Sequence, residues 1–328
     1  MHTDRIHFTS DGHRLSAWLD RPESAEPHSA VVLIHGSGPT SLEQEPRYLA
    51  IRKAFTQTGL ACLMWDKPGC GHSEGERRQI QSYRERAGEV VAALDWLNGR
   101  SDIDPSRIGL WGISEGVWIS AMVASERRDV HWVILVSGPS STLAYAAEYI
   151  ARINLKLDGH SRAEIESHLT TIRQCFQLLE SGAPFEAFLE VSESMRANSF
   201  FQLTGWSKLS HADWEDHVSR ENVQADTRAL LRGVKCPVLA VFGEQDSQVD
   251  WRTSMRVHQQ ILREAGNADV TVTTFAGANH NMRRCGTGSV RETRSGGQGE
   301  YVAGYVETMV EWLQQRAMPD TATRYDAR

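Results

Sequence analysis

The sequence has few cysteines, no surplus of positive charge and no long apolar run, and each absence excludes a class of protein. Its five cysteines are spread over 328 residues and never occur as a C-x-x-C pair, so we expect neither a disulfide framework nor a zinc site. Lys and Arg number 35 against 42 for Asp and Glu, which provides no positive field for a phosphate backbone. We therefore expect no metal and no nucleic-acid partner.

Signals for export or for membrane insertion are also missing. Charged side chains interrupt the first twenty residues, and no apolar run of about 18 residues occurs elsewhere. Scattered, unpaired cysteines fit a reducing compartment. The sequence thus predicts a cytoplasmic protein with no membrane segment. It leaves the oligomeric state open, a homodimer included.

Short apolar runs alternate with longer stretches of helical spacing. Six of these runs are predicted strands, and most of them are continuous in hydrophobicity, as buried parallel strands are. They lie at 31–34, 60–65, 108–111, 132–136, 238–242 and 270–275. An alternating pair at 6–8 and 15–19, divided by Asp11-Gly12, is typical of an edge hairpin. Strands that alternate with helices predict an α/β protein with a doubly wound, mostly parallel sheet.

One stretch, residues 140–235, contains no strand pattern and begins with two long helical periods. We interpret it as a helical cap inserted into a discontinuous core of residues 1–139 and 236–316. Open α/β sheets bind ligands at the carboxyl edge of their strands, so the cap is expected there. An independent helical domain is the alternative.

Two further segments lack a regular pattern. Residues 283–300 are rich in glycine and arginine and are typical of a mobile loop. Residues 317–328 are polar and predict a flexible C-terminal tail.

The strongest local signal is the GISEG motif at 112–116, which follows one predicted strand directly and precedes an apolar helical run. This is G-x-S-x-G between strand and helix, where a sharp turn exposes the serine oxygen. The amino end of the helix favours the negative charge that develops when this oxygen attacks. The motif therefore predicts Ser114 as a nucleophile.

A serine hydroxyl requires a base and a group that orients the base. Asp246 follows the strand at 238–242 and His280 follows the strand at 270–275, so both lie at the edge that also holds Ser114. The chain order Ser, Asp, His is that of α/β-hydrolases. Asp250, four residues further along, is the alternative carboxylate.

An oxyanion hole is expected in the HGSGP turn at 35–39, from the amide of Ser37 or Gly38 together with the amide of Glu115. The turn lacks the Lys-Ser/Thr ending of a phosphate loop. The glycine-rich segment at 66–75 lacks it too and is interpreted as a loop that shapes the pocket wall. Candidate pocket residues, each with an alternative reading as core or backbone brace, are His35, Trp206 and Trp214.

Together these motifs resemble the α/β-hydrolase superfamily, and within it bacterial serine esterases of the acyl-peptidase-like and dienelactone-hydrolase-like branch. The motifs are HGSGP (35–39), DKPGCGHSEG (66–75), DPSRIGLWGISEG (104–116), GEQD (243–246), GANHN (277–281) and GYVETMVEWL (304–313). The resemblance implies an α/β-hydrolase fold, a Ser114, His280, Asp246 triad, an acyl-enzyme and no cofactor. It departs from relatives whose nucleophile is cysteine or aspartate.

The expected function is hydrolysis of a carboxylic ester of a small molecule. Because acyl-enzyme formation does not specify the acceptor, an acyltransferase, a thioesterase or a peptidase that uses the same triad is the alternative. A non-catalytic receptor that keeps the fold is the rival from another class.

Overall fold

A computed structural model describes residues 1–23, 27–44, 48–196, 198–215, 218–295 and 299–316, and its strands form one eight-stranded sheet. The sheet order is β1-β2-β4-β3-β5-β6-β7-β8. The strands are β1 (His2–Ser10), β2 (His13–Arg21), β3 (His28–Ile34), β4 (Leu60–Trp65), β5 (Ile103–Ile113), β6 (Val133–Val136), β7 (Val238–Gly243) and β8 (Val270–Phe275). Only the pairings β1–β2 and β2–β4 are antiparallel among these strands. The predicted doubly wound, mostly parallel sheet is confirmed.

Each predicted strand falls on an observed one, although β3 and β5 begin earlier than their apolar runs. Strands β3, β4, β6 and β7 are buried at every position, as strands covered on both faces are. The edge hairpin also forms as predicted. Asp11 and Gly12 have φ of 46° and 75°, which is the left-handed pair that a two-residue hairpin turn requires.

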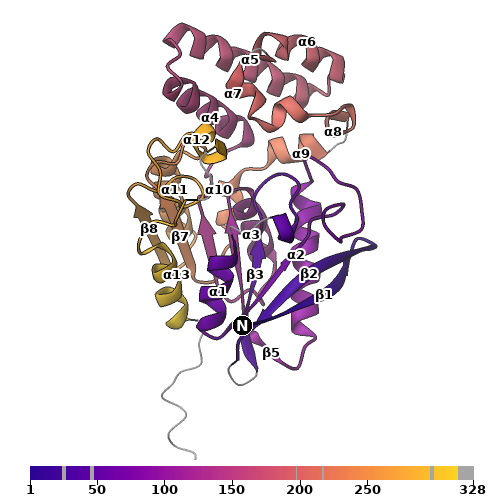
Figure 1. The fold of residues 1–328 in the computed structure, drawn as a ribbon, viewed down its shortest axis with the longest axis vertical. Coiled ribbons are helices and arrows are strands. Elements are labelled where there is room, and N and C mark those ends of the chain that lie inside the picture. The colour runs from indigo at the N-terminus through magenta and orange to yellow at the C-terminus, as the bar shows by residue number, and fades with distance from the viewer. Residues whose placement is uncertain (24–26, 45–47, 197, 216–217, 296–298, 317–328) are drawn as a thin grey trace, which may run out of the picture.

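Helices cover both faces of the sheet (Figure 1). One face packs against α1 (Leu49–Gln57) and α13 (Tyr305–Gln314), and the other against α2 (Tyr83–Asn98), α3 (Glu115–Glu126) and α11 (Trp251–Glu264). Neighbouring residues of β3 alternate between the two hydrophobic clusters, as the pleat of a strand dictates. The sheet is therefore the middle layer of three.

A further layer of helices lies above the carboxyl edge of the sheet, between β6 and β7 in the sequence (Figure 1). It comprises α4 (Leu143–Leu157), α5 (Arg162–Ser181), α6 (Phe185–Arg196), α7 (Ser199–Gln202), the 3-10 helix η3 (Gly205–Lys208), α8 (His211–Glu215) and α9 (Val218–Gln224). Aromatic stacking holds it together, with the ring centroids of Phe188 and Trp214 4.8 Å apart. The layer thus has a small core of its own.

This helical layer ends before the predicted boundary at residue 235. The short helix α10 (Thr227–Leu231) packs against α3 and α11. Leu231 and Val234 are fully buried in the hydrophobic cluster on the face of the sheet that α2, α3 and α11 cover. The chain therefore returns to the core soon after α9.

The Gly/Arg-rich loop at 283–300 contains a short helix, α12 (Val290–Ser295). Glu292 fixes this part of the chain, since its carboxylate accepts hydrogen bonds from the amides of Gly286, Thr287 and Gly288 at 2.6–2.9 Å. These bonds, and the Thr287 hydroxyl first, lower the pKa of Glu292 to about 2. The predicted tail, 317–328, lies outside the described residues.

One short 3-10 helix, η1 (Leu42–Gln44), completes the described elements. None of the helices that the structure describes is both long and apolar enough to cross a membrane.

Candidate active site

Ser114 lies at the turn between β5 and α3, with φ of 57° and ψ of −120°, a conformation that costs energy for a residue with a side chain. The flanking glycines are required sterically. A Cβ at Gly112 would lie 2.3 Å from Ser120 Oγ, and a Cβ at Gly116 would lie 2.5 Å from the Ile34 carbonyl oxygen. The G-x-S-x-G segment therefore forms the strained elbow that its sequence predicts.

Asp246 and His280 form a buried pair. His280 Nδ1 lies 2.8 Å from Asp246 Oδ2, so the other ring nitrogen, Nε2, is left for chemistry. The second carboxylate oxygen of Asp246 accepts the amides of Gln248 and Val249 at 2.7 and 2.9 Å. The Asp246 side chain is completely buried, and these bonds hold it against the imidazole.

Asp250, the alternative carboxylate, has a different position. It is the N-cap of α11, where one oxygen accepts the Thr253 amide at 3.2 Å and the other accepts the Tyr145 hydroxyl at 2.8 Å. The structure thus brings Asp246, and not Asp250, to His280.

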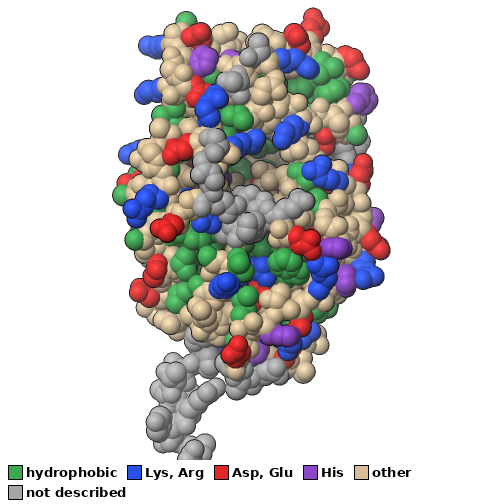
Figure 2. All heavy atoms as spheres, viewed as in Figure 1, with side chains coloured by type: hydrophobic (Ala, Val, Ile, Leu, Met, Phe, Trp, Pro, Cys, Tyr) green, Lys and Arg blue, Asp and Glu red, His purple; other side chains and the backbone are tan. Residues whose placement is uncertain are grey.

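Ser114 and His280 line the same cavity, of about 580 Å³, which we call the polar cleft. Among the described residues no hydrogen bond joins the serine oxygen to the imidazole. Charged side chains also line the cleft, namely Lys208, Arg283, Arg284, Glu292 and Arg294. On the face drawn in Figure 2, Lys and Arg side chains lie around the level where the helical layer meets the sheet.

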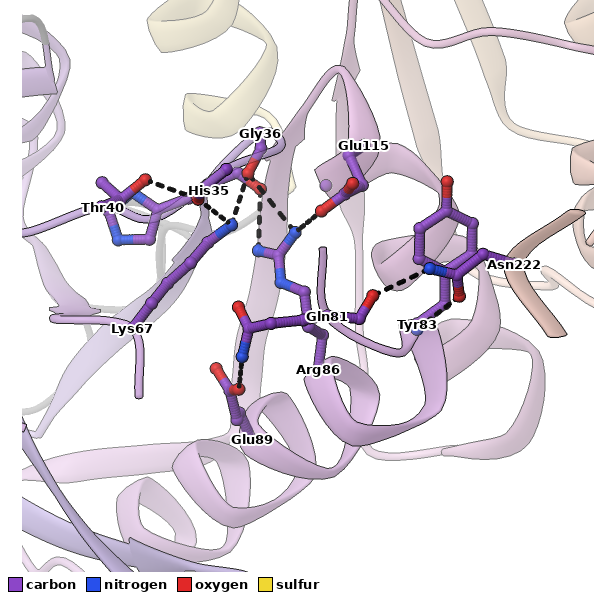
Figure 3. A network of polar contacts seen from close by, with 12 residues as sticks. His35, Gly36, Thr40, Lys67, Gln81, Tyr83, Arg86, Glu89, Glu115 and Asn222 are labelled. Atoms are coloured by element: carbon purple, nitrogen blue, oxygen red, sulfur yellow. Dashed lines mark hydrogen bonds and ion pairs between the residues drawn. The ribbon is translucent and has the colours of Figure 1, made fainter. Parts of the chain in front are cut away.

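Two buried basic side chains, Lys67 and Arg86, donate hydrogen bonds to backbone carbonyls of the HGSGP turn (Figure 3). Lys67 Nζ donates to the carbonyl oxygens of Gly36 and Gly38 at 2.7 and 2.8 Å. Arg86 donates to the His35 carbonyl at 2.8 Å and forms a short ion pair with Glu115. Both cationic side chains are 2% exposed, so their charges act in an environment that screens them little.

This arrangement orients the Ser37 amide. In a trans peptide the N–H points opposite to the C=O, so a Gly36 carbonyl held by Lys67 turns the Ser37 N–H the other way. Ser37 lines the polar cleft together with Ser114. Gly38 is a poorer candidate donor. Its amide shares a peptide group with the Ser37 carbonyl, whereas Lys67 fixes the Gly38 carbonyl.

His35 was predicted as a pocket residue, but it is not among the described residues that line the polar cleft or the second, more apolar cavity. Its Nε2 lies 2.7 Å from the Trp65 carbonyl oxygen and its ring packs edge-on against Tyr48. The histidine therefore braces the backbone, which was the alternative reading of its position in a glycine-rich turn.

A second cavity, of about 290 Å³, lies between the turn and the helical layer, and we call it the apolar chamber. Its lining includes Ser37, Gly38 and Glu115 on the sheet side and mainly aliphatic and aromatic side chains on the other, among them Leu143, Ala147, Ile172, Leu179, Met195, Phe201 and Trp214. Ser37, Gln248, Val290 and Arg294 line both cavities.

Of the two tryptophans expected in the pocket, Trp214 lines the apolar chamber. It is also core, since it is 3% exposed and its indole N–H donates to the Ala183 carbonyl at 2.7 Å. The side chain of Trp206 lies outside the described residues. Nowhere in the described ranges do three or more His, Cys, Asp or Glu side chains gather as metal ligands would.

Comparison with known proteins shows the family to which the chain belongs. A family model for X-Pro dipeptidyl-peptidases (S15 family) matches residues 11–277, which is most of the chain. The chain belongs to the S15 family. It is 32% identical over 124 residues to the quorum-quenching protein AidA of Acinetobacter baumannii, a match that covers 38% of this chain and 40% of AidA. The match thus spans well under two thirds of that relative's length.

Solved structures confirm the α/β-hydrolase fold of this S15 member. DcsB, solved with a substrate analogue, superposes with a TM-score of 0.63 at 15% identity and covers 97% of this chain and 100% of its own. The esterase Pf2001 of Pyrococcus furiosus has a TM-score of 0.60 at 16% identity and covers 97% of this chain and 91% of its own. The resemblance of the motifs to this superfamily is confirmed.

Sequence reasoning about this S15 member missed Lys67 and Arg86. Lys67 stands in the DKPGCGHSEG segment, directly after β4, and a lysine at the carboxyl end of a buried strand was the available signal. Arg86 carries no such signal, because it lies in the charged first turns of α2, next to the exposed Arg84 and Glu85. Burial, and next the Arg86 charge, lower the pKa of Lys67.

Proposed function

We propose that this protein is a serine hydrolase that cleaves a carboxylic ester through an acyl-enzyme on Ser114. The observation that carries the proposal is the buried Asp246–His280 pair, 2.8 Å apart, whose histidine lines the same cleft as a serine on a strained elbow. An imidazole that is oriented by a carboxylate and lines the same cleft as a serine is the arrangement that can activate a hydroxyl.

In the first half of the proposed cycle, His280 takes the proton of Ser114 as Oγ bonds to the ester carbonyl carbon. The carbonyl oxygen becomes an oxyanion that the amides of Ser37 and Glu115 stabilise, each such donor contributing roughly 3 kcal/mol. When the bond to the leaving oxygen breaks, His280 gives that oxygen the proton. Asp246 stabilises the imidazolium that forms in between.

In the second half, water replaces the leaving group. The water oxygen bonds to the acyl carbon while His280 takes one proton of the water. His280 then returns this proton to Ser114 Oγ as the acyl–enzyme bond breaks. The carboxylic acid leaves and the enzyme is restored. Lys67 and Arg86 act as positioning residues, because they hold the carbonyls of the turn that supplies the Ser37 donor.

Cleavage of a dipeptide from an amino terminus is less well supported by the site. A free ammonium group requires a carboxylate partner. The carboxylates lining the two cavities, within the described residues, are Glu292 and Glu115. Both are engaged, Glu292 by its own loop and Glu115 by Arg86.

Acyl transfer is a second candidate, favoured by the size of the cleft beside Ser114. A volume of about 580 Å³ greatly exceeds the roughly 30 Å³ share of one water molecule. Adding alcohols or thiols during turnover tests it, because a transferase gives the new ester in preference to the free acid.

The test of the proposed function compares para-nitrophenyl hexanoate with an X-Pro para-nitroanilide, using the full chain and its Ser114→Ala variant. We expect hydrolysis of the ester and an acyl adduct on Ser114 by mass spectrometry after acid quench. Cleavage of the anilide alone would favour a peptidase. A folded protein that cleaves neither substrate and forms no adduct would favour a receptor.

A further inference from the structure

We infer that the site takes esters with an apolar acyl group and a leaving group that carries a negative charge. The inference rests on the proposed function and adds the substrate class. It comes from the two cavities that meet at the Ser37 turn, because they differ in chemistry and only one of them contains the proposed general acid.

The apolar chamber suits the acyl group. It begins at the proposed oxyanion donors, Ser37 and Glu115, and continues between side chains such as Ala147, Leu179 and Phe201 of the helical layer. Burying an apolar chain there is favourable by about 0.8 kcal/mol for each CH₂. Its volume of about 290 Å³ limits the acyl group to a medium length.

The polar cleft suits the leaving group because His280 lines it. In acyl transfer the same imidazole that takes the serine proton gives it to the leaving atom, so this atom lies within hydrogen-bond reach of the ring. In the described linings His280 contributes to the polar cleft and not to the apolar chamber. The alcohol part of the ester therefore occupies the cleft.

Charge in this cleft is mainly positive. The described lining contains four cationic side chains and one carboxylate. The cations are Lys208, Arg283, Arg284 and Arg294, and the carboxylate is Glu292. Both oxygens of that carboxylate already accept hydrogen bonds from residues 286–288 of its own loop. Glu292 is thus committed to loop structure and does not neutralise the cleft.

Arginines of the same segment differ in a way that points to a ligand. Arg291 forms an ion pair with Asp158 at 3.0 Å, and Arg283 donates to the Gly299 carbonyl at 2.7 Å. Arg284 and Arg294 line the cleft, and within the described part of the chain neither has an ion-pair partner. A guanidinium fits a carboxylate or a phosphate through two parallel hydrogen bonds.

The test uses hexanoyl esters of three para-substituted phenols, two of which carry a negative charge, and each kcat/KM is divided by the rate of uncatalysed hydrolysis because the phenols differ in acidity. They are the esters of para-hydroxybenzoate, of its neutral methyl ester and of para-hydroxyphenyl phosphate. We expect kcat/KM for an anionic ester to exceed that for the neutral one about tenfold, as one or two charge-assisted hydrogen bonds allow. The carboxylate and phosphate arms show which anion is preferred. The ratio should fall as salt is added.

Arg284→Gln combined with Arg294→Gln should bring the ratio of anionic to neutral ester close to one. Arg291→Gln, a substitution on the same helix at an arginine paired outside the cleft, is the matched control and should keep the wild-type ratio. Hydrolysis of the neutral ester with no preference for either anion, or a preference that survives the double substitution, would overturn the inference alone. Absence of hydrolysis of all three esters would overturn the proposed function as well.

Discussion

The two walls of the site are built in different ways. The sheet-side wall consists of a strained serine, a carboxylate-bound histidine and a turn held by Lys67 and Arg86, all with hydrogen-bonded partners or steric constraints. The wall from the helical layer consists mainly of apolar side chains. Hydrogen bonds have directions, whereas apolar contacts adapt to shape, so the first wall can position reacting atoms and the second can select by size.

From this difference we expect substitutions in the two walls to have different effects, one on the chemical step and the other on the choice of substrate. Changes in the sheet-side wall should lower kcat for every ester. Changes in the helical wall should alter the preference among esters and leave the smallest substrates little affected.

Replacing His280 by Ala should lower kcat by about 10⁴-fold or more, as loss of a triad base does. The reason is that His280 is the only histidine among the described residues that line the cleft, and the Glu292 carboxylate is held by its own loop. Steady-state kinetics with para-nitrophenyl acetate measures the effect, and circular dichroism checks the fold. A variant with normal kcat would remove His280 from the mechanism.

Replacing Asp246 by Asn should lower kcat by roughly 10³- to 10⁴-fold, since the imidazole loses its orienting carboxylate. Asp250→Asn is the matched control, because Asp250 caps α11 and accepts the Tyr145 hydroxyl. It should cost at most about 1 kcal/mol of stability and leave kcat within a few-fold of wild type. The reverse ranking of the two variants would contradict the assignment of the acid.

Lys67→Met should lower kcat between about 10- and 100-fold, because the turn that presents the Ser37 amide is no longer held, and one oxyanion donor contributes up to 10²- to 10³-fold. KM should change little, since the oxyanion forms only in the transition state. Lys53→Met on the exposed side of α1 is the control. A rise in KM with unchanged kcat would show that Lys67 serves binding alone.

Ala147→Phe should lower kcat/KM for a hexanoyl ester about tenfold and leave an acetyl ester almost unchanged, because the larger ring fills the apolar chamber. The matched control is Ala163→Phe on the exposed side of α5. Equal losses for both chain lengths would show that the chamber does not hold the acyl group.

A further prediction concerns the pH dependence of stability and not activity. The pKa of Lys67 is lowered from its ordinary value of 10.5 by burial first and by Arg86 next. Between the lowered pKa and 10.5 the unfolded chain binds the proton that the folded chain has lost, so this group makes stability rise with pH in that window. Urea unfolding of wild type and Lys67→Met across this range should show a smaller rise in the variant. Parallel curves would contradict the shift.

Sequence patterns predict the fold well where local and tertiary preferences agree. The bounds of β4 and β8 were predictable because glycine or aspartate closely flanks each run, at Gly59 and Asp66 and at Asp269 and Gly277. The end of the helical layer was not, since α10 is helical by pattern and only its packing on α3 assigns it to the core.

The site shows the same limit. The positions of Ser114, Asp246 and His280 at one edge of the sheet were predictable because each residue follows a predicted strand. Lys67 and Arg86 act through carbonyl groups of another segment, at separations of 29 to 51 residues, and nothing in local sequence specifies such a partner. His35 was misplaced because sequence shows that a histidine lies in the turn but not the side to which its ring points.

The most direct test of the central claim, that the sheet edge unites an activated serine with a buried Asp–His pair, is the rate at which a fluorophosphonate labels the full chain. Peptide mass spectrometry should find the adduct on Ser114, and His280→Ala should slow its formation at least about 100-fold. Labelling of another residue, or of Ser114 at the same rate in the His280→Ala protein, would contradict the account.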